Sequence, residues 1–230
     1  MRRKPVSESL TKKIFKWLML TGVCGVVAAG CIGLVVFSVV YYKLPPIDAL
    51  TEYRPKIPLR IYTADGDLIG EFGEERREFV SIEDMPRHMR LAILAAEDNG
   101  FYEHSGIEFM GIARAALSNL LTGSRGQGGS TITMQVARNF FLTSERSYVR
   151  KLYEVALAFK IEQNLTKDEI FEAYANQIFL GHRSYGFGSA AQTYFGKDLK
   201  DLSISEAAVL AGLPVAPSAY NPIVNMRRAT

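Results

Sequence analysis

An uninterrupted apolar run stands apart from the rest of the chain. Residues 18–42, "LMLTGVCGVVAAGCIGLVVFSVVYY", contain no charged side chain. A helix of this length spans about 37 Å at about 1.5 Å per residue, which is enough to cross the hydrocarbon core of a bilayer. Trp17, Tyr41 and Tyr42 lie at its two ends, where interfacial aromatic side chains are usual. The pattern predicts a transmembrane helix at residues 18–42.

Residues 43–80 contain a Pro-rich stretch followed by β-prone runs. The stretch 43–59 contains four prolines, which is typical of a stiff connector. Two alternating, β-prone runs in "RIYTADGDLIGEF" then flank Asp65-Gly66, and this arrangement predicts a β-hairpin. The following "REFVSI" favours a third short strand. We therefore expect a Pro-rich connector and short β-strands in this part of the chain.

A helical pattern begins at Ser81. Pro86 is suited to open a helix in its first turn, and this helix carries apolar residues as far as Glu97. The segment 107–121 is also apolar at helical spacing. Gly123 follows it, and glycine is usual just after a helix end.

The helical pattern continues through the rest of the chain. Residues 130–142 and 147–165 each predict a helix, the second long and amphipathic. Capping boxes at 166–169 ("TKDE") and 203–206 ("SISE") predict the starts of two more. The fold class we expect for 81–230 is mainly α, preceded by the small β element.

Length and charge narrow the class of protein. The chain has 230 residues, 48% of them hydrophobic, which suffices for one medium domain and an additional segment. The net charge is +3, but residues 1–17 alone carry +5. Because the basic excess belongs to this tail, no nucleic-acid partner is indicated. A basic tail before a transmembrane helix predicts a cytoplasmic N-terminus and an outer location for everything after Lys43.

The apolar run has two other interpretations. The apolar region of a cleaved signal peptide is shorter, about 7–15 residues. The run "AAGC" ending at Cys31 resembles a lipoprotein cleavage site, but eleven more uncharged residues follow it. We favour an uncleaved anchor, with lipoprotein processing left open. Cys24 and Cys31 both lie inside the run, so the remainder has no disulfide framework and no cysteine metal site.

Two adjacent carboxylates, Glu97 and Asp98, end the first helical segment in "EDNGFYEHSG". They are either solvated acids at a helix end or parts of a catalytic site. Phe101 would help to desolvate a carboxylate and raise its pKa, as a general base requires. His104 would hydrogen-bond a carboxylate or hold the loop. A zinc site is not indicated, because none of the chain's three histidines stands at a metal-ligand spacing from another.

A second set of polar residues lies in "GGSTITMQVARN" (128–139). Thr131, Gln135 and Arg138 are spaced i, i+4 and i+7, which places them on one helix face. The preceding glycine-rich loop and the helix N-terminus offer backbone N–H groups to an anion. The loop lacks the G-K-[ST] ending of a nucleotide-binding P-loop. The alternative is an ordinary surface helix after a flexible loop.

A third set lies in "RKLYE" (150–154). Arg150 and Glu154 are at i and i+4, and Lys151 is adjacent. The default interpretation is an ion pair on a helix surface, worth about 0.3–0.5 kcal/mol. The functional interpretation is a pair of cations that hold phosphates beside a second carboxylate.

The order of these segments is more specific than any one of them. Together with "KDEIFEAYANQIFLG", they resemble the first four motifs of the peptidoglycan glycosyltransferases (glycosyltransferase family 51). These are the lysozyme-like domains of bifunctional, class A penicillin-binding proteins and of monofunctional relatives. The resemblance covers about residues 43–230, and residues 59–86 resemble the N-terminal region of the 1A type. It includes no transpeptidase domain, and a fifth motif begins near "YNPIVNMRRA". We therefore expect either a truncated class A protein or a stand-alone transferase.

The resemblance implies roles for individual residues. Glu97 would be the catalytic base and Glu154 the second essential carboxylate. Two positions depart from the family pattern: Met134 stands where a glutamine is usual, and Arg138 replaces a common lysine. The remaining residues expected to support or contact substrate are Asp98, Phe101, His104, Ser130, Thr131, Gln135, Arg138, Asn139, Arg150 and Lys151.

The implied reaction is polymerisation of lipid II into glycan strands. The growing glycan would pass, with inversion, from undecaprenyl pyrophosphate to the 4-hydroxyl of the acceptor. The expected partners are lipid II, the lipid-linked glycan, the membrane and unidentified cell-wall synthesis proteins. A divalent cation (Mg²⁺ or Mn²⁺) at the pyrophosphate is compatible with this chemistry, and no organic cofactor is implied. The expected location is the cytoplasmic (inner) membrane, single-pass, with the catalytic domain on the periplasmic face.

Two other functions remain open at this point. A lysozyme-like glycan-cleaving enzyme would also use one glutamate, but as an acid on a glycosidic oxygen. Such an enzyme has no phosphate leaving group and no use for the cations Arg138, Arg150 and Lys151. The second alternative is a non-catalytic, membrane-anchored assembly factor.

Overall fold

The structure is a computed structural model that describes residues 10–51, 59–66, 68–123, 129–142 and 147–224. The chain divides into two compact units, residues 1–44 and 45–230. In the first unit, α1 (Leu10–Tyr42) is a single helix of 33 residues. Its segment Lys13–Tyr42 is long and apolar enough to cross a membrane, and an 18-residue window within it has a mean hydropathy of 2.6. The helix therefore contains the expected span and begins eight residues earlier.

The second unit is mainly helical, as the sequence predicts. Its short strands form two separate two-stranded sheets. Helices dominate because most apolar positions recur at helical spacing, which buries one face of each helix. The helical elements are α2 (Asp48–Thr51), α3 (Arg87–Glu97), α4 (Phe109–Thr122), α5 (Ile132–Phe141), α6 (Tyr148–Glu162), α7 (Lys167–Gln177), α8 (Phe187–Phe195), η1 (Leu199–Asp201), α9 (Ile204–Gly212) and η2 (Leu213–Val215).

The predicted hairpin is confirmed. Strands β1 (Leu59–Tyr62) and β2 (Leu68–Phe72) pair antiparallel across the Asp65-Gly66 turn. Gly66 has a φ of 95°, a backbone conformation that a side chain at Cβ would disfavour. Both strands are short, and the pairing shifts register between Ile61 and Tyr62.

The prediction of a third strand in "REFVSI" is wrong in extent and in partner. Strand β3 is limited to Arg76–Arg77, and it pairs in parallel with β4 (Ser184–Tyr185) rather than with the hairpin. The reason is a long-range contact. The Arg77 guanidinium donates to Gln177 Oε1 at 2.7 Å and stacks 4.5 Å from the centroid of the Tyr185 ring. Local β propensity could not reveal a partner about a hundred residues away.

The predicted helix boundaries depend on local chemistry, and they are confirmed. Pro86 precedes α3 as its N-cap residue, and Gly123 ends α4 in the left-handed conformation. Both capping boxes form, with Thr166 and Ser203 each accepting from the N–H three residues later. The glycine-rich loop is only described at its ends, because residues 124–128 lie outside the described part of the chain.

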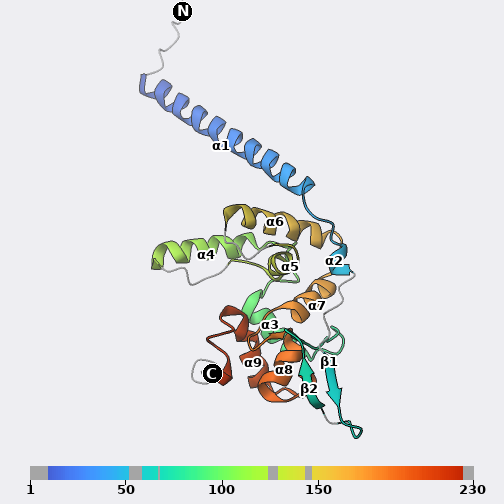
Figure 1. Cartoon of the computed structure of the whole chain (residues 1–230). Helices are drawn as coiled ribbons and strands as arrows, with labels where there is room; N and C mark the ends of the chain where they lie inside the picture. The colour runs from blue at the N-terminus through green and yellow to red at the C-terminus, as the bar shows by residue number, and fades with distance from the viewer. Residues whose placement is uncertain (1–9, 52–58, 67, 124–128, 143–146, 225–230) are drawn as a thin grey trace, which may run out of the picture. The chain divides into compact units, whose positions relative to one another are not determined.

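The second unit has two helical layers, which Figure 1 shows. Helices α4, α5 and α6 lie in one layer, and α3, α8 and α9 lie in the other, with α7 between them. Helix α5 packs against both α6 and α7, and α3 packs against α9. The C-terminal end of α3 and the start of α5 lie next to each other, since the backbone N–H of Ile132 donates to Asp98 Oδ2 at 3.0 Å.

Candidate active site

A cavity of about 730 Å³ opens between the two layers of the second unit. Its walls come from the end of α3, the loop after it, the start of α4, residues 129–131, one face of α5 and η2. Six of the residues singled out from the sequence line it: Glu97, Asp98, Ser130, Thr131, Gln135 and Arg138. The predicted i, i+4, i+7 face of Thr131, Gln135 and Arg138 is therefore confirmed as one wall of a pocket.

Glu97 is the last residue of α3, so a regular helix holds its backbone. The Gln135 side chain donates from Nε2 to Glu97 Oε2 at 2.6 Å. Burial raises the pKa of Glu97 above its ordinary value, Gln135 and Arg138 oppose the rise, and the Asp98 charge adds to it. A carboxylate with a raised pKa that is held by one hydrogen bond suits a group that takes up a proton.

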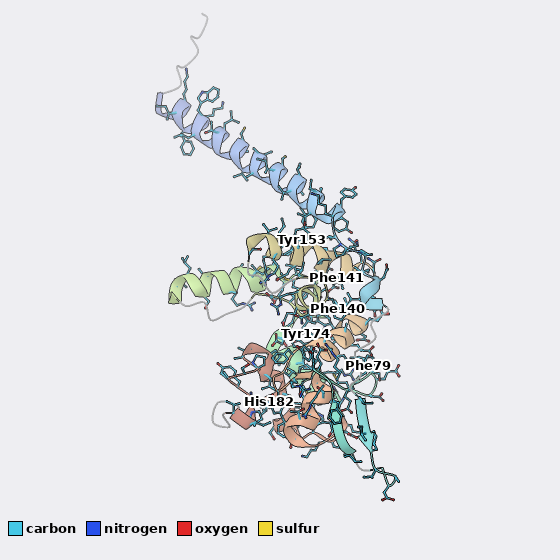
Figure 2. The ribbon with its side chains drawn as sticks, viewed as in Figure 1. Phe79, Phe140, Phe141, Tyr153, Tyr174 and His182 are labelled. Carbon is cyan, nitrogen blue, oxygen red and sulfur yellow. The ribbon has the colours of Figure 1, made fainter. Side chains whose placement is uncertain are left out.

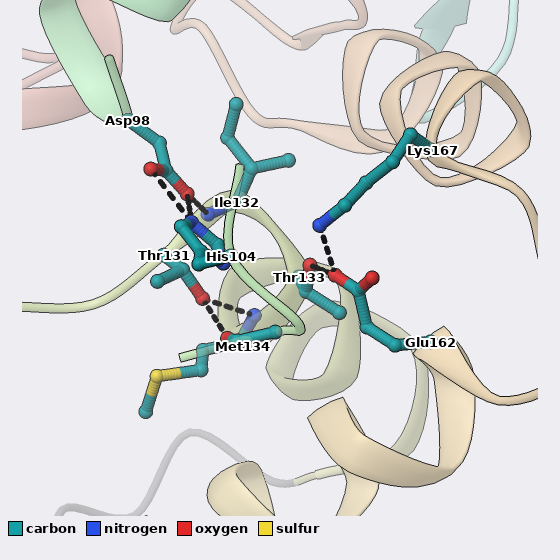
Figure 3. A network of polar contacts seen from close by, with 9 residues as sticks. Asp98, His104, Thr131, Ile132, Thr133, Met134, Glu162 and Lys167 are labelled. Carbon is teal, nitrogen blue, oxygen red and sulfur yellow. Dashed lines mark hydrogen bonds and ion pairs between the residues drawn. The ribbon is translucent and has the colours of Figure 1, made fainter. Parts of the chain in front are cut away.

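Asp98 is buried and both of its oxygens have partners inside the protein. The backbone N–H of Ile132 donates to Oδ2 at 3.0 Å, and His104 Nε2 lies 3.0 Å from each oxygen (Figure 3). Asp98 therefore ties the loop after α3 to the N-terminus of α5. This arrangement agrees with a supporting role, since a base needs an accessible oxygen.

Thr131 caps α5 and connects it to the same loop. Its Oγ1 accepts from Met134 N at 3.2 Å and donates to the carbonyl of Gly106 at 2.6 Å. Gly106 has a φ of 87°, and a side chain there would meet the backbone of Ala158. Met134, in the first turn of α5, is fully buried beside Ile107 and Ala158. The departure from the family pattern at Met134 therefore falls in the core and not in the cavity.

Phe101 does not line the cavity. It is fully buried, with its ring centroid 6.0 Å from that of Phe171 and 4.4 Å from Lys167 Nζ. Phe101 therefore lies in the core beneath the loop, and its expected contribution to the desolvation of a carboxylate stays a prediction. The ring fills the core beneath the loop because that is where an apolar side chain gains most free energy by burial.

Three supporting residues were not identified from the sequence. Lys167 pairs with Glu162 at 2.7 Å, and Thr133 of α5 donates to the same Glu162 oxygen at 2.6 Å (Figure 3). This pair anchors the start of α5 to α6 and α7. No local signal could have revealed it, because Lys167 appears in the sequence only as part of a capping box.

Glu154 is the centre of a second polar cluster. Its side chain is about 2% exposed and pairs with Arg150 Nε at 3.1 Å and Lys151 Nζ at 2.9 Å. The interpretation of "RKLYE" as a surface ion pair is therefore wrong, since a buried carboxylate depends strongly on its cations. The Lys151 side chain is 44% exposed, so this cation can also reach a ligand.

The two clusters are joined through Ser130. Lys151 Nζ donates to Ser130 Oγ at 2.7 Å, and Ser130 lines the cavity that contains Glu97. Arg138 lines the cavity from α5. Asn139 is half-buried and is not part of the cavity wall. Of these cations, Arg138 lines the cavity near Glu97, and Lys151 is connected to the cavity through Ser130.

The cavity also contains residues for which the sequence made no prediction. Glu103, Glu108 and Arg114 line it from the loop and from α4. A further feature of α4 is its exposed apolar surface, where Phe109, Met110, Leu117, Leu120 and Leu121 are each more than half exposed. Helical spacing predicted the helix, but only its packing shows that these side chains are left uncovered.

The described residues include no ready-made cluster of metal ligands. Within residues 10–224, as far as they are described, no three His, Cys, Asp or Glu side chains come together in a group that could hold a metal ion. Glu154, the carboxylate nearest to Lys151, is already paired with two cations.

The second unit is a mainly α domain with a cavity lined by Glu97, a carboxylate whose pKa is raised by burial, and with a cationic cluster around the buried Glu154. The family model described as Transglycosylase matches residues 65–230. The chain therefore belongs to the transglycosylase family.

Individual relatives agree with this assignment. The chain is 56% identical over 216 residues to penicillin-binding protein 1A of Neisseria meningitidis serogroup A, covering 92% of the chain and 27% of the relative. It is 58% identical over 200 residues to the protein of the same name from Neisseria gonorrhoeae, covering 86% and 25%. For the one from Pseudomonas aeruginosa the identity is 49% over 222 residues, covering 95% and 26%. The chain thus spans about a quarter of the length of these relatives.

One solved structure is also similar. It is the crystal structure of penicillin-binding protein 1A from Haemophilus influenzae, which is 34% identical and has a TM-score of 0.40. The similarity covers 76% of this chain and 17% of that one.

Proposed function

We propose that this chain is a peptidoglycan glycosyltransferase that polymerises lipid II. The observation that carries the proposal is the pairing of a proton-accepting Glu97 with the Arg150–Lys151–Glu154 cluster, joined through Ser130. The membership of the transglycosylase family and the similarity to penicillin-binding proteins 1A support it.

Glu97 would act on the acceptor sugar. As the 4-hydroxyl oxygen attacks C1 of the donor, its proton passes to the Glu97 carboxylate. Gln135 holds the other carboxylate oxygen at 2.6 Å and so limits rotation of the base. The raised pKa of Glu97 brings the base closer to neutral pH, where proton transfer is most effective.

The cationic cluster would act on the leaving group. When the C1–oxygen bond to the pyrophosphate breaks, both electrons stay on the phosphate oxygen. Lys151, Arg150 and Arg138 supply fixed positive charge for that oxygen. Glu154 keeps Arg150 and Lys151 in place, and Lys151 and Ser130 present donors together.

An exposed apolar surface on α4 suits the lipid part of the proposed substrate. The apolar side chains exposed along α4 adjoin the cavity, because Gly111, Ile112 and Ala115 of the same helix line it. A polyprenyl chain leaving the cavity would meet this apolar surface. A soluble polysaccharide would leave it exposed to water.

The glycan-cleaving alternative accounts for less of the structure. A raised pKa at Glu97 suits a general acid as well as a base. The buried Glu154 with its two cations has no function in cleavage of a neutral glycosidic bond. The transferase reaction uses both clusters, and we therefore prefer it.

The test is incubation of the full chain in detergent with labelled lipid II, and in parallel with preformed glycan. We expect polymer from lipid II and no shortening of the glycan. Shortening without polymer would support the cleaving enzyme, and neither product would support the assembly factor. Repeating the assay with EDTA tests the Mg²⁺ or Mn²⁺ ion that we propose to enter with the pyrophosphate.

We also propose that α1 is an uncleaved anchor with the N-terminus in the cytoplasm. The basic tail of residues 1–17 and the apolar Lys13–Tyr42 helix support this orientation. Protease added to spheroplasts should digest the part after Lys43 and leave the tail intact. In permeabilised cells both parts should be digested. Protection of the C-terminal part in intact spheroplasts would reverse the proposed topology.

A further inference from the structure

The cavity that contains Glu97 has two arginines among its described lining residues, Arg138 on α5 and Arg114 on α4. Arg138 already acts on the base, since its charge opposes the rise in the pKa of Glu97. The Arg114 side chain is exposed, and no carboxylate of a described residue forms an ion pair with its guanidinium. Arg114 is therefore a cation of the cavity wall that the proposed mechanism does not use.

Arg114 lies at the border between two faces of α4. The first face lines the cavity, and Gly111 and Ala115 belong to it. The second face is apolar and open to solvent, with Met110 74% exposed and Leu117 58% exposed. At about 100° per residue, Met110 and Leu117 stand beside Arg114 on the side opposite to Gly111 and Ala115. Figure 2 shows α4, the light green helix, extending beyond the neighbouring helices of the second unit.

This order of surfaces matches the order of groups in a lipid-linked sugar, where a pyrophosphate joins the sugar to a polyprenyl chain. With the sugar in the cavity, a pyrophosphate at Arg114 would be followed by an apolar chain on the face that carries Met110 and Leu117. A guanidinium suits the central group, because its planar N–H groups donate in pairs to phosphate oxygens. The surface of α4 thus offers each part of such a molecule a group of complementary chemistry.

The proposed reaction involves two lipid-linked pyrophosphates. The pyrophosphate of the donor leaves, and it is served by the cluster of Arg150, Lys151 and Glu154. The pyrophosphate of the acceptor keeps all its bonds, but it is an anion at a cavity that Glu103 and Glu108 also line. Because carboxylates repel such an anion, binding of the acceptor requires a cation that is separate from the donor cluster.

We propose that Arg114 binds the pyrophosphate of the lipid-linked acceptor, while the 4-hydroxyl of the same molecule reaches Glu97. The enzyme would thereby distinguish a lipid-linked acceptor from an uncharged glycan end by its phosphates. The inference rests on the proposed function, since it assigns the second substrate of that reaction to the same cavity.

The first test is a single transfer from a preformed lipid-linked glycan to two acceptors. One acceptor is lipid II, and the other carries an uncharged linker in place of the pyrophosphate, so that it cannot act as a donor. For Arg114→Gln we expect the KM for lipid II to rise about tenfold, as loss of one charge-assisted contact typically gives. The kcat and the KM for the uncharged acceptor should not change. An equal rise in KM for both acceptors would overturn the proposal, and so would a fall in kcat alone, which would assign Arg114 to the leaving group.

Arg87→Gln is a matched control. Arg87 is also an exposed helical arginine, the first residue of α3, and it does not line the cavity. We expect both KM values of this variant to stay at those of the wild type. A tenfold rise in its KM for lipid II would assign the effect to the net charge of the domain and would refute the role of Arg114.

The second test measures binding without turnover. In the Glu97→Gln background, the full chain in detergent is titrated with fluorescent lipid II and with the uncharged analogue. Arg114→Gln should weaken binding of lipid II about tenfold and leave binding of the analogue unchanged, also when Lys151→Ala removes a cation of the donor cluster. Loss of the Arg114 effect in the Lys151→Ala protein would place both cations at one pyrophosphate and contradict the proposal. Arg114-dependent binding by a chain that makes no polymer would refute only the proposed function.

Discussion

Glu97→Gln is expected to lower the initial rate of lipid II polymerisation by about 10²–10⁴-fold, the usual cost of losing a general base. Glutamine keeps the size of the side chain and a carbonyl oxygen for the Gln135 amide. It has no carboxylate to accept the proton of the acceptor hydroxyl. The variant should still bind lipid-linked ligand, because the cationic cluster is untouched. The measurement is the initial rate, together with binding of the donor.

The same substitution should not destabilise the fold. Since burial raises the pKa of Glu97, the charged form is disfavoured in the folded state, and its cost is present at neutral pH. Below the unfolded pKa of glutamate, about 4.3, the group is neutral in both states and this cost disappears. Glu97→Gln should therefore melt at the same or a higher temperature than the wild type at pH 7. The difference should shrink as the pH falls toward 4.

Asp98→Asn is the matched comparison, and we expect it to affect the stability of the fold more than the rate. Asp98 accepts from Ile132 N and pairs with His104, so an amide there leaves one buried contact mismatched. We expect a loss of about 1–3 kcal/mol in the free energy of unfolding and a smaller loss of rate than for Glu97→Gln. If Glu97→Gln retains more activity than Asp98→Asn, the two roles are reversed.

The second large effect is expected at the cationic cluster. Lys151→Ala should reduce polymerisation by about 10²–10³-fold, as loss of one charge-stabilising donor typically does. Its ammonium contacts both Glu154 and Ser130, so its removal also takes one of two cations from the buried Glu154, and a thermal melt accompanies the rate measurement. Arg150→Ala should reduce the rate similarly and should destabilise the protein for the same reason.

Lys197→Ala provides the control for charge and exposure. Lys197 is 43% exposed and pairs with Glu206 at 2.7 Å, much as Lys151 pairs with Glu154. It does not line the cavity, and an exposed ion pair of this kind contributes little to stability because solvent screens it. The rate should therefore stay near that of the wild type. Near-normal polymerisation by Lys151→Ala would assign "RKLYE" a structural role alone.

Much of the candidate site was accessible from residue order alone. Thr131, Gln135 and Arg138 share a helix face by spacing, and the structure confirms that face as a cavity wall. The contact between Glu97 and Gln135 could not be predicted from the sequence, since the two residues are 38 positions apart. The family resemblance supplied the roles, but the hydrogen bond between these side chains required the tertiary fold that brings the end of α3 to α5.

Sequence by itself determined the local features: the apolar α1, the Asp65-Gly66 hairpin, and the starts and ends of helices at Thr166, Ser203 and Gly123. These features depend on backbone conformation and on hydrogen bonds within a few residues, so residues that are close in the sequence suffice to predict them.

Tertiary structure alone decided which side chains are buried and what they meet. It paired β3 with β4, placed Phe101 and Met134 in the core, and enclosed Glu154 with its cations. It also left the Tyr174 hydroxyl buried on α7, the helix that packs against α5. Burial and long-range contacts depend on how whole elements pack, and the same local pattern is compatible with either a solvated or a buried side chain. The raised pKa of Glu97, on which the proposed chemistry depends, was also decided by the tertiary structure, because the largest cause of the rise is burial.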